Sequence, residues 1–260
     1  MLKYSGSVPE HYDSDGGPYL LTPYAKQFVG RLASLELPPQ PRVLELACGT
    51  GRLTAELCSH FPPEVRIVAT DLSEAMLSVG RGRVSGNVEW RQADMQALPF
   101  SAESFDLVVA QFGLMLVPDR SKALSEAYRV LAPGGRLVFS VWSENSTLHH
   151  IGVNAAIPFL EGVSAESIES TKAAPFTLAD TAKTTGDLLS HGFSEVTTDT
   201  ASIDIADIDA WSKGFVFGTG IGGNIPEHRR EEAIAALKLA YTPHQPVPSE
   251  AIFYKARKNA

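Results

Sequence analysis

An acidic residue and two glycines stand together in the segment Val43–Thr54, which reads Val-Leu-Glu-Leu-Ala-Cys-Gly-Thr-Gly-Arg-Leu-Thr. Gly49 and Gly51 lack a Cβ, so the backbone there can turn sharply and approach a ligand closely. Glu45 places a carboxylate just before this turn, where it would repel a phosphate and could hold an ammonium group. These residue types therefore favour a nucleoside that carries an amino acid over a dinucleotide.

The same turn has two phosphate-binding interpretations, and both fit it poorly. The dinucleotide fingerprint places a third glycine three residues after the second, and here that position is Thr54. A phosphate loop requires Gly-Lys-Ser or Gly-Lys-Thr, and neither occurs near the turn. A tight loop without any ligand is the remaining alternative, so the segments that follow have to decide.

Polar side chains also stand at the ends of two later apolar runs. Asp71 follows the run 65–70, and an acid at such a strand end can accept hydrogen bonds from both ribose hydroxyls. A helix N-cap is the alternative role for Asp71, but Ser73 is already placed to cap the next helix. Gln111 ends the run 105–110 and either contacts a ligand or caps its strand.

These residues need strands that bring their ends to one edge of a sheet. Near-continuous apolar runs are typical of parallel strands buried on both faces, and ligands bind at the carboxyl ends of such strands. The segment Ala132–Gly135 is expected to end a helix and form a turn. The patterns predict strands from 43 and at 65–70, 88–92, 105–111, 136–142, 194–205 and 251–256, and helices at 24–35, from 53, at 124–131, 178–192 and 226–241.

Three segments carry a resemblance to one family. Glu45-Leu-Ala-Cys-Gly-Thr-Gly51 resembles motif I of the class I S-adenosylmethionine (SAM)-dependent methyltransferases, and 129–140 resembles a post-motif segment typical of them. Val8–Asp13 resembles the N-terminal segment that covers the cofactor in the ubiquinone/menaquinone-type group. The resemblance implies an α/β fold: a Rossmann-like, seven-stranded, doubly wound sheet with an antiparallel last strand, plus helical insertions that form a substrate cap.

The resemblance also implies the cofactor and the residues that hold it. SAM would be bound, and S-adenosylhomocysteine (SAH) would be the product. The glycine turn and Glu45 would hold the amino-acid end, Asp71 the ribose, and Asp94 with Met95 the adenine. A tyrosine of the N-terminal segment would place an aromatic face beside the sulfonium cation. The residues expected at the cofactor are Tyr12, Glu45, Ala47, Gly49, Gly51, Asp71, Leu72, Met76, Asp94, Met95 and Gln111.

The resemblance also suggests how the chain is divided into segments. Residues 1–41 are expected to form an N-terminal lid and helix, although a loosely packed arm is an equal alternative for 1–25. Residues 42–260 are expected to form the SAM-binding core, with cap insertions at about 143–177 and 206–247. Glycines 218, 220, 222 and 223 follow no strand and are expected to form a flexible loop.

Bulk composition limits the partners. The 260 residues carry a net charge of -8, which disfavours sequence-independent binding to nucleic acid. No apolar run has signal length or bilayer length, so no membrane span and a cytoplasmic location are expected. Cys48 and Cys58 form no metal or redox motif, and the adjacent His149 and His150 do not share a helix face, so no metal is expected. The number of subunits is open, with a homodimer among the alternatives.

The expected reaction is methyl transfer from SAM to a small-molecule acceptor by direct in-line displacement. Aromatic residues in the insertions favour an apolar or aromatic acceptor. No catalytic residue is predicted, and an NAD-dependent oxidoreductase and a non-catalytic SAM-binding protein remain alternatives. The candidate lining residues are Trp142, Phe159, Trp211, Phe215 and Phe217.

Overall fold

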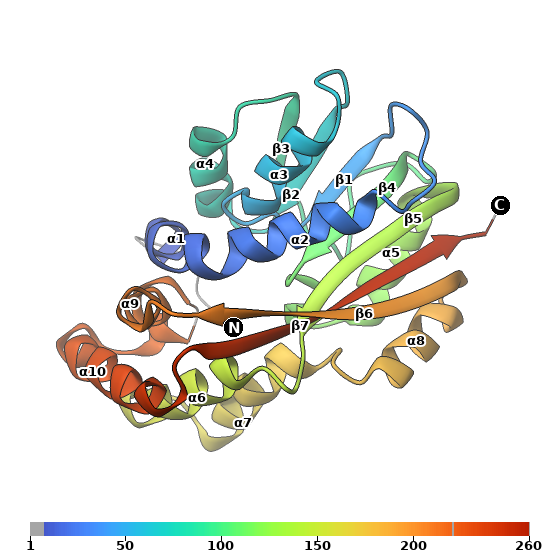
Figure 1. Cartoon of the computed structure of the whole chain (residues 1–260). Helices are drawn as coiled ribbons and strands as arrows, with labels where there is room; N and C mark the ends of the chain where they lie inside the picture. Colours follow the sequence, from blue (N-terminus) through green and yellow to red (C-terminus); the bar gives the residue numbers. More distant parts are fainter. Residues whose placement is uncertain (1–7, 220, 260) are drawn as a thin grey trace.

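The computed structural model describes residues 8–219 and 221–259, and its seven strands form one sheet in the order β3-β2-β1-β4-β5-β7-β6 (Figure 1). Expectations that involve residues 1–7, Gly220 or Ala260 lie outside the described residues. Strands β1 to β5 pair in parallel, and β7 is antiparallel to both β5 and β6. The predicted Rossmann-like sheet with an antiparallel last strand is confirmed. The strands are β1 (Val43–Leu46), β2 (Ile67–Asp71), β3 (Val88–Gln92), β4 (Phe105–Gln111), β5 (Leu131–Trp142), β6 (Phe193–Ile205) and β7 (Val247–Lys258).

Burial explains why the strands differ in composition. Every residue of β1 is buried, and β4 is buried at five of its seven positions, as expected for strands covered on both faces. Strand β6 lies at an edge, and its residues alternate between more and less exposed positions. Because β1, β2, β4 and β5 run in parallel, their carboxyl ends meet at one edge of the sheet.

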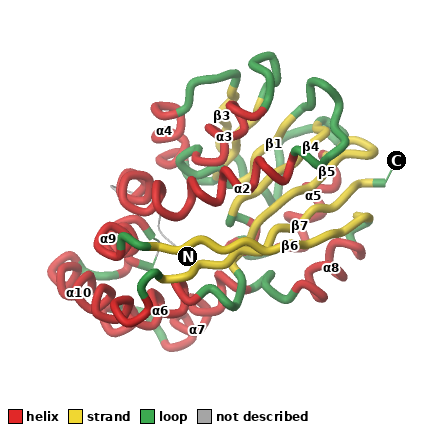
Figure 2. Tube along the Cα trace, viewed as in Figure 1, coloured by secondary structure: helices red, strands yellow, loops and turns green. Residues whose placement is uncertain are grey.

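The helices surround the sheet, which forms one continuous layer in Figure 2. Side chains at the first turn of several helices accept backbone N–H groups: Ser73 caps α4 and Asp119 caps α5. The helices of the core are α3 (Arg52–His60), α4 (Glu74–Arg83), η2 (Leu114–Leu116), α5 (Arg120–Val130) and α8 (Thr181–Ser190). In the described residues, no helix is both long and apolar enough to cross a bilayer.

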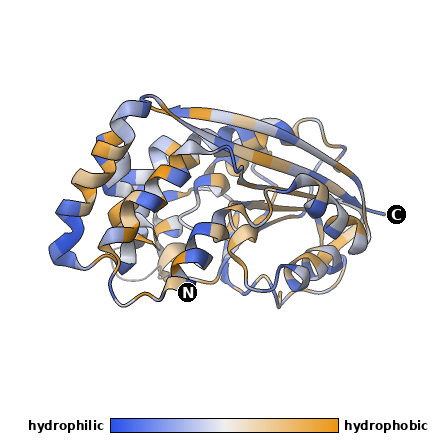
Figure 3. Cartoon of the chain, turned by 90° about the horizontal axis from the view of Figure 1, so that it is seen from below, coloured by the Kyte–Doolittle hydropathy of each residue, from blue (hydrophilic) through white to orange (hydrophobic). Residues whose placement is uncertain are grey.

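A second group of helices gathers beyond one end of the sheet, at the lower left of Figure 1. The Trp211 indole N–H donates to the Tyr241 hydroxyl at 3.0 Å, and that hydroxyl donates to the Leu148 carbonyl at 3.0 Å. Three helices are thereby joined, and Figure 3 shows mixed hydrophobic and hydrophilic positions along them. The group contains α6 (Thr147–Ala156), η3 (Ile157–Phe159), α7 (Ala165–Ala173), η4 (Ala174–Phe176), α9 (Ile208–Gly218), η5 (Gly222–Asn224), η6 (Glu227–Arg229), α10 (Arg230–Tyr241) and η7 (Thr242–His244).

The N-terminal segment is helical from the first described residue. A short helix, α1 (Val8–His11), continues into the π-helix η1 (Tyr12–Leu21) and then into α2 (Thr22–Leu32). Gly16, Gly17, Leu20 and Leu21 are buried, so the loosely packed arm is wrong for residues 8–25. The helix predicted at 24–35 exists but begins and ends earlier.

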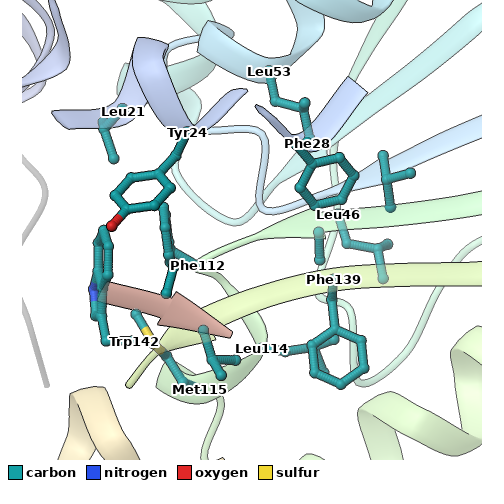
Figure 4. Close-up of a cluster of buried hydrophobic side chains, with 14 of the residues drawn as sticks. Leu21, Tyr24, Phe28, Leu46, Leu53, Phe112, Leu114, Met115, Phe139 and Trp142 are labelled. Atoms are coloured by element: carbon teal, nitrogen blue, oxygen red, sulfur yellow. The ribbon is translucent and has the colours of Figure 1, made fainter. Parts of the chain in front are cut away.

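The core lies on both faces of the sheet, under α2 on one side and under α5 and α8 on the other. Phe28 of α2 packs against Phe253 of β7, with 6.0 Å between ring centroids, whereas Phe139 of β5 stacks on Tyr254 at 4.7 Å. Phe253 and Tyr254 are consecutive strand residues and point to opposite faces of the sheet, and Figure 4 shows the Phe28 and Phe139 rings on opposite sides of β5. The segment Ala132–Gly135 differs from the prediction, because β5 already begins at Leu131 and Gly134 turns within it at φ 78°. The neighbouring strand shifts register between Phe105 and Leu107, which accommodates this irregularity.

Candidate cofactor and acceptor site

The glycine turn after β1 is packed on one side and open on the other. Gly49 and Gly51 both adopt left-handed φ angles, 55° and 78°. A Cβ on Gly51 would lie 2.7 Å from the Trp90 ring, so only glycine fits there. A Cβ on Gly49 would meet nothing within 4 Å. The backbone at Gly49 therefore faces space in which a ligand can approach.

Asp71, at the end of β2, holds this turn. One carboxylate oxygen accepts the Gly49 backbone N–H at 2.9 Å, and the other accepts the Ser73 N–H at 2.8 Å. Burial raises the pKa of Asp71, and these backbone N–H groups act in the opposite direction. Each carboxylate oxygen can accept more than one hydrogen bond. Asp71 thus joins two strand ends and keeps acceptor capacity; its contact with ribose stays a prediction.

Glu45 lies beneath the turn and is only 1% exposed. The Thr54 hydroxyl donates to its carboxyl group at 2.7 Å. Burial and the nearby Asp71 raise the pKa of Glu45 to about 8, because burial disfavours the charged carboxylate and Asp71 disfavours a second negative charge beside its own. A cation brought into this site would stabilise the carboxylate. The proposed contact with an ammonium group stays a prediction.

The residues expected around adenine occupy neighbouring loops. Leu72 is 63% exposed, whereas Met76 is buried at 4%. The Gln96 side-chain amide donates to both oxygens of Asp94, at 3.0 and 3.1 Å, and the Gln96 backbone N–H donates at 2.8 Å. Asp94 therefore already shapes its own turn, and a role at adenine would use its remaining acceptor capacity.

Gln111 connects the end of β4 to the N-terminal segment. Its amide N–H donates to the Leu21 carbonyl at 3.1 Å. Its amide oxygen is buried and has no hydrogen-bond partner among the residues that the structure describes. Buried acceptors are normally paired, so a ligand that donates a hydrogen bond would fit this position.

Two residues on neighbouring loops of the site have an uncommon backbone conformation. Phe112 and Ala47 both have positive φ, 57° and 50°, which is uncommon for residues other than glycine. A Cβ on Gly113 would lie 2.4 Å from the Ala47 Cβ and 3.7 Å from the Met95 methyl carbon. Strained backbone often clusters at functional sites. The turn after β1, the loop after β3 and the loop after β4 therefore meet at Gly113.

The charges around the turn disfavour a pyrophosphate. Arg52, which directly follows the glycine turn, donates to the Asp13 carboxylate at 3.0 Å. Arg83 of α4 also pairs with Asp13. Both guanidinium groups are thus engaged by the N-terminal segment, while Glu45 and Asp71 supply acidic groups beneath the turn. This arrangement suits a ligand with positive charge.

Comparison with known proteins agrees with this geometry. Residues 43–135, which contain the glycine turn, Asp71, Asp94 and Gln111, match the family described as "Methyltransferase domain". Residues 43–135 of this chain therefore form a methyltransferase domain. The chain is 45% identical over 107 residues to the "Ubiquinone/menaquinone biosynthesis C-methyltransferase UbiE" of Enterobacter sp. (strain 638). That match covers 39% of this chain and 43% of the relative, so the chain spans less than half of the relative's length.

Solved structures share the fold over more of the chain than the methyltransferase domain alone. "Phosphoethanolamine N-methyltransferase 2" of Haemonchus contortus, solved in complex with SAM, aligns with a TM-score of 0.66 at 16% identity, covering 99% of this chain and 58% of that one. A putative methyltransferase from Bacillus halodurans C-125 aligns with a TM-score of 0.58 at 20% identity, covering 90% of this chain and 99% of that one. At these identities the likeness concerns the fold.

A cavity of about 130 Å³ lies beyond the ends of β4 and β5. Tyr12 lines it, as do Trp142, Trp211 and Phe215 from the predicted aromatic set. The other two predicted aromatics lie elsewhere: Phe159 packs under the Arg229 guanidinium, and Phe217 packs against His11. The lining residues that sequence reasoning missed include Leu20, Leu21, Phe112, Met115, His149 and Val153.

Aromatic rings form one wall of this cavity. Phe112 and Trp142 stack at 3.5 Å between ring centroids, and Figure 4 shows them side by side near Met115. The His149 ring lies 4.1 Å from the Trp142 ring on the cap side. The position of Phe112 right after β4 could have revealed it, because that strand end borders the site. His149 gave no such signal, since its direction depends on how α6 packs.

The two adjacent histidines point to different surroundings. His149 is buried, whereas the exposed His150 ring bonds through Nε2 with the Glu144 carbonyl at 2.7 Å. In the described part of the chain, no three His, Cys, Asp or Glu side chains are grouped so that they could hold a metal ion.

Proposed function

We propose that this chain transfers a methyl group from SAM to a small-molecule acceptor with an apolar or aromatic body. The observation that carries the proposal is the open glycine turn, tied by Gly49 to Asp71 at 2.9 Å within the matched methyltransferase domain. The aromatic cavity supports the acceptor side, because Phe112 lines it and the next residue, Gly113, packs against Ala47 of the turn.

The residues around the turn fit SAM. Glu45 and the backbone at Gly49 would hold the amino-acid end, where acidic groups suit an ammonium. Asp71 would accept from the ribose hydroxyls, and the unpaired amide oxygen of Gln111 would accept a further N–H or O–H. Adenine would lie between the loops that carry Leu72 and Asp94, near Met76 and Met95. SAM supplies a methyl group on a positively charged sulfur, which a nucleophile can attack in line.

The chain's own contribution is to position the acceptor and exclude water. The N-terminal helix and the cap helices close around an apolar space, so an acceptor held there is oriented before the reaction. Tyr12 lines that space from η1 and would contribute an aromatic face next to the sulfonium. Holding the two reactants in one geometry is the main source of rate that this arrangement offers.

The two alternatives are less well supported. An NAD-dependent oxidoreductase would need groups for a pyrophosphate, and both Arg52 and Arg83 are paired with Asp13. A non-catalytic SAM-binding protein would not need a cavity beside the turn. We therefore rank methyl transfer first.

Calorimetric titration with SAH tests the proposal. Replacing Asp71 with Ala should weaken SAH binding by about 1.5–3 kcal/mol, or roughly 10- to 150-fold, the usual range for a hydrogen bond to a charged group. Asp71→Asn keeps one acceptor for the backbone and separates loss of the ligand contact from loss of the turn. Asp209→Ala is the matched control, because Asp209 is 75% exposed on α9 and pairs with Lys238.

The outcome that contradicts the proposal is equally specific. Wild-type protein that ignores SAH but enhances NADH fluorescence would favour the oxidoreductase. SAH binding without methyl transfer from labelled SAM to any of a series of apolar hydroxyl, amine and thiol acceptors would favour the non-catalytic alternative.

A further inference from the structure

The acceptor cavity has a mainly apolar lining that includes the imidazole ring of one histidine. His149 lines the cavity with Phe112, Trp142 and Val153. Its Nδ1 bonds with the Ser146 hydroxyl at 2.8 Å. No hydrogen-bond partner for its Nε2 occurs in the described part of the chain. Nε2 is therefore the histidine atom left to meet an acceptor.

The surroundings of His149 fix its ring. The ring lies 4.1 Å from the Trp142 ring, with 34° between the ring planes. The Ser146 hydroxyl, which contacts Nδ1, lies 3.4 Å from the Ser249 hydroxyl. The His149 ring is therefore held by a small cluster of buried serine hydroxyls. A nitrogen held in this way can accept a hydrogen bond at Nε2 when Nδ1 carries the ring proton and donates it to Ser146.

We propose that His149 receives the hydroxyl group of the acceptor, so that the cavity selects a ring-sized apolar molecule bearing one hydroxyl and directs methylation to its oxygen. The inference rests on the proposed function. The cavity of about 130 Å³ suits one ring, since an apolar protein cavity of about 150 Å³ binds benzene. A site built to pair a hydroxyl also rejects analogues that lack it, because the buried nitrogen would be left unpaired.

The proton and charge balance favour this role. The acceptor oxygen forms a bond to the methyl carbon, the carbon–sulfur bond breaks with its electron pair kept on sulfur, and the hydroxyl proton passes to Nε2. Burial lowers the pKa of His149 to about 3, with a smaller effect from His150, so the ring is neutral and its nitrogen is available beforehand. Because positive charge disappears from sulfur as it appears on the imidazole, the cavity gains no net charge.

Binding of phenol and toluene tests the proposal without relying on turnover. The two molecules have similar size, and only phenol has a hydroxyl. Calorimetry on the SAH-loaded and the free protein should show His149→Phe weakening phenol binding by roughly three- to tenfold, the range of one neutral hydrogen bond, while toluene binding changes less than twofold. His149→Gln, which keeps a polar acceptor, should retain part of the phenol affinity, and His150→Phe should retain all of it.

A second readout reports the nitrogen itself. In protein labelled with ¹⁵N-histidine, phenol should shift the Nε2 resonance of His149 and toluene should not. Equal loss of phenol and toluene affinity in His149→Phe, or an unmoved Nε2 resonance in the presence of bound phenol, would overturn the inference. Failure of the proposed function looks different: SAH would not bind the wild-type protein, whatever phenol does.

Discussion

At the scale of single residues, the site is defined by acidic groups in an unusual environment. Glu45 and Asp71 lie close enough for the charge of one to raise the pKa of the other, and burial raises both. In the described residues, neither carboxyl group has a basic side chain as a hydrogen-bond partner; Thr54 donates to Glu45, and backbone N–H groups donate to Asp71. This local excess of acid distinguishes the site from one made for phosphates.

The raised pKa of Glu45 predicts that the free energy of unfolding depends on pH. A carboxyl group with a pKa of about 8 in the folded state and about 4.5 when unfolded binds its proton more tightly in the folded protein. Its contribution to stability is therefore full below pH 4.5 and lost as the pH rises through 8. Relative to Glu45→Gln, the wild-type protein should lose stability over this interval, with a slope approaching about 1.4 kcal/mol per pH unit.

Urea unfolding at pH 5, 6.5 and 8 measures this difference. Glu231→Gln, at an exposed position of α10, serves as the control and should run parallel to the wild type at all three pH values. If Glu45→Gln also ran parallel, the carboxyl group would be ionised throughout and the assigned environment would be incorrect.

At the scale of elements, the N-terminal helix is the part that can cover the site. Asp13 of η1 pairs with Arg52 of α3 and with Arg83 of α4, and its side chain is 15% exposed. The Arg52 guanidinium also donates to the Thr22 hydroxyl at 2.9 Å. These contacts hold η1 against α3 and α4, the helices that follow β1 and β2.

Asp13→Asn should therefore loosen η1. We expect faster hydrogen exchange over 12–21 and faster dissociation of SAH, by roughly tenfold, because two guanidinium groups lose a charged partner. Stopped-flow displacement and hydrogen-exchange mass spectrometry measure the two effects. Asp15→Asn is the matched control, since Asp15 forms its ion pair with His11 of the adjoining helix turn and not with α3 or α4 in the described residues. Unchanged dissociation in Asp13→Asn would show that η1 does not retain the ligand.

Close packing between η1 and α9 gives a second prediction at this scale. A Cβ on Gly214 would lie 2.7 Å from the Gly16 backbone nitrogen, so Gly214→Ala has to push the two helices apart. We expect a loss of about 1–3 kcal/mol in the free energy of unfolding. Gly30→Ala on α2 meets nothing within 4 Å and should instead stabilise by about 0.4–1 kcal/mol. Chemical denaturation of both variants provides the test; equal effects would exclude the steric explanation.

The elements also show what sequence could and could not predict. The buried parallel strands were readable because both of their faces are apolar, and Ser73 was correctly expected to cap α4. The π-helix was not readable, because its Tyr, Asp, Gly and Pro content is typical of a loop and its order comes from Arg52, Arg83 and α9. The start of β5 at Leu131 was missed for a similar reason: Pro-Gly-Gly signals a turn, yet pairing with β4 continues across it.

At the scale of the whole molecule, one sheet carries the two proposed sites, and they meet at Gly113. Most of the residues proposed to hold the cofactor lie near the carboxyl ends of β1 to β4, while the cavity draws on η1, β5, α6 and α9. The first set was predicted from the sequence through strand ends and a motif, and its contacts with the cofactor stay a prediction. The second set depends on how distant helices pack, so aromatic composition identified only Trp142, Trp211 and Phe215 correctly.

Ligand binding should stabilise the whole fold. At an SAH concentration of about 100 times Kd, linkage adds about 2.7 kcal/mol, which raises Tm by roughly 5–11 °C for a chain of this size. Differential scanning fluorimetry with SAH, NADH and adenosine compares the candidates directly. A larger shift with NADH than with SAH would contradict the proposed cofactor.

The position of β7 has a consequence for biosynthesis. This strand is made after β6 yet lies between β5 and β6, so both neighbours expose unpaired edges until it arrives. Exposed edges template association with other chains, and a nascent polypeptide emerges N-terminus first. A ribosome paused before Val247 would hold a chain in which β5 and β6 are made but β7 is not. The speed of translation through the codons of β7 would then influence how much of the protein escapes aggregation.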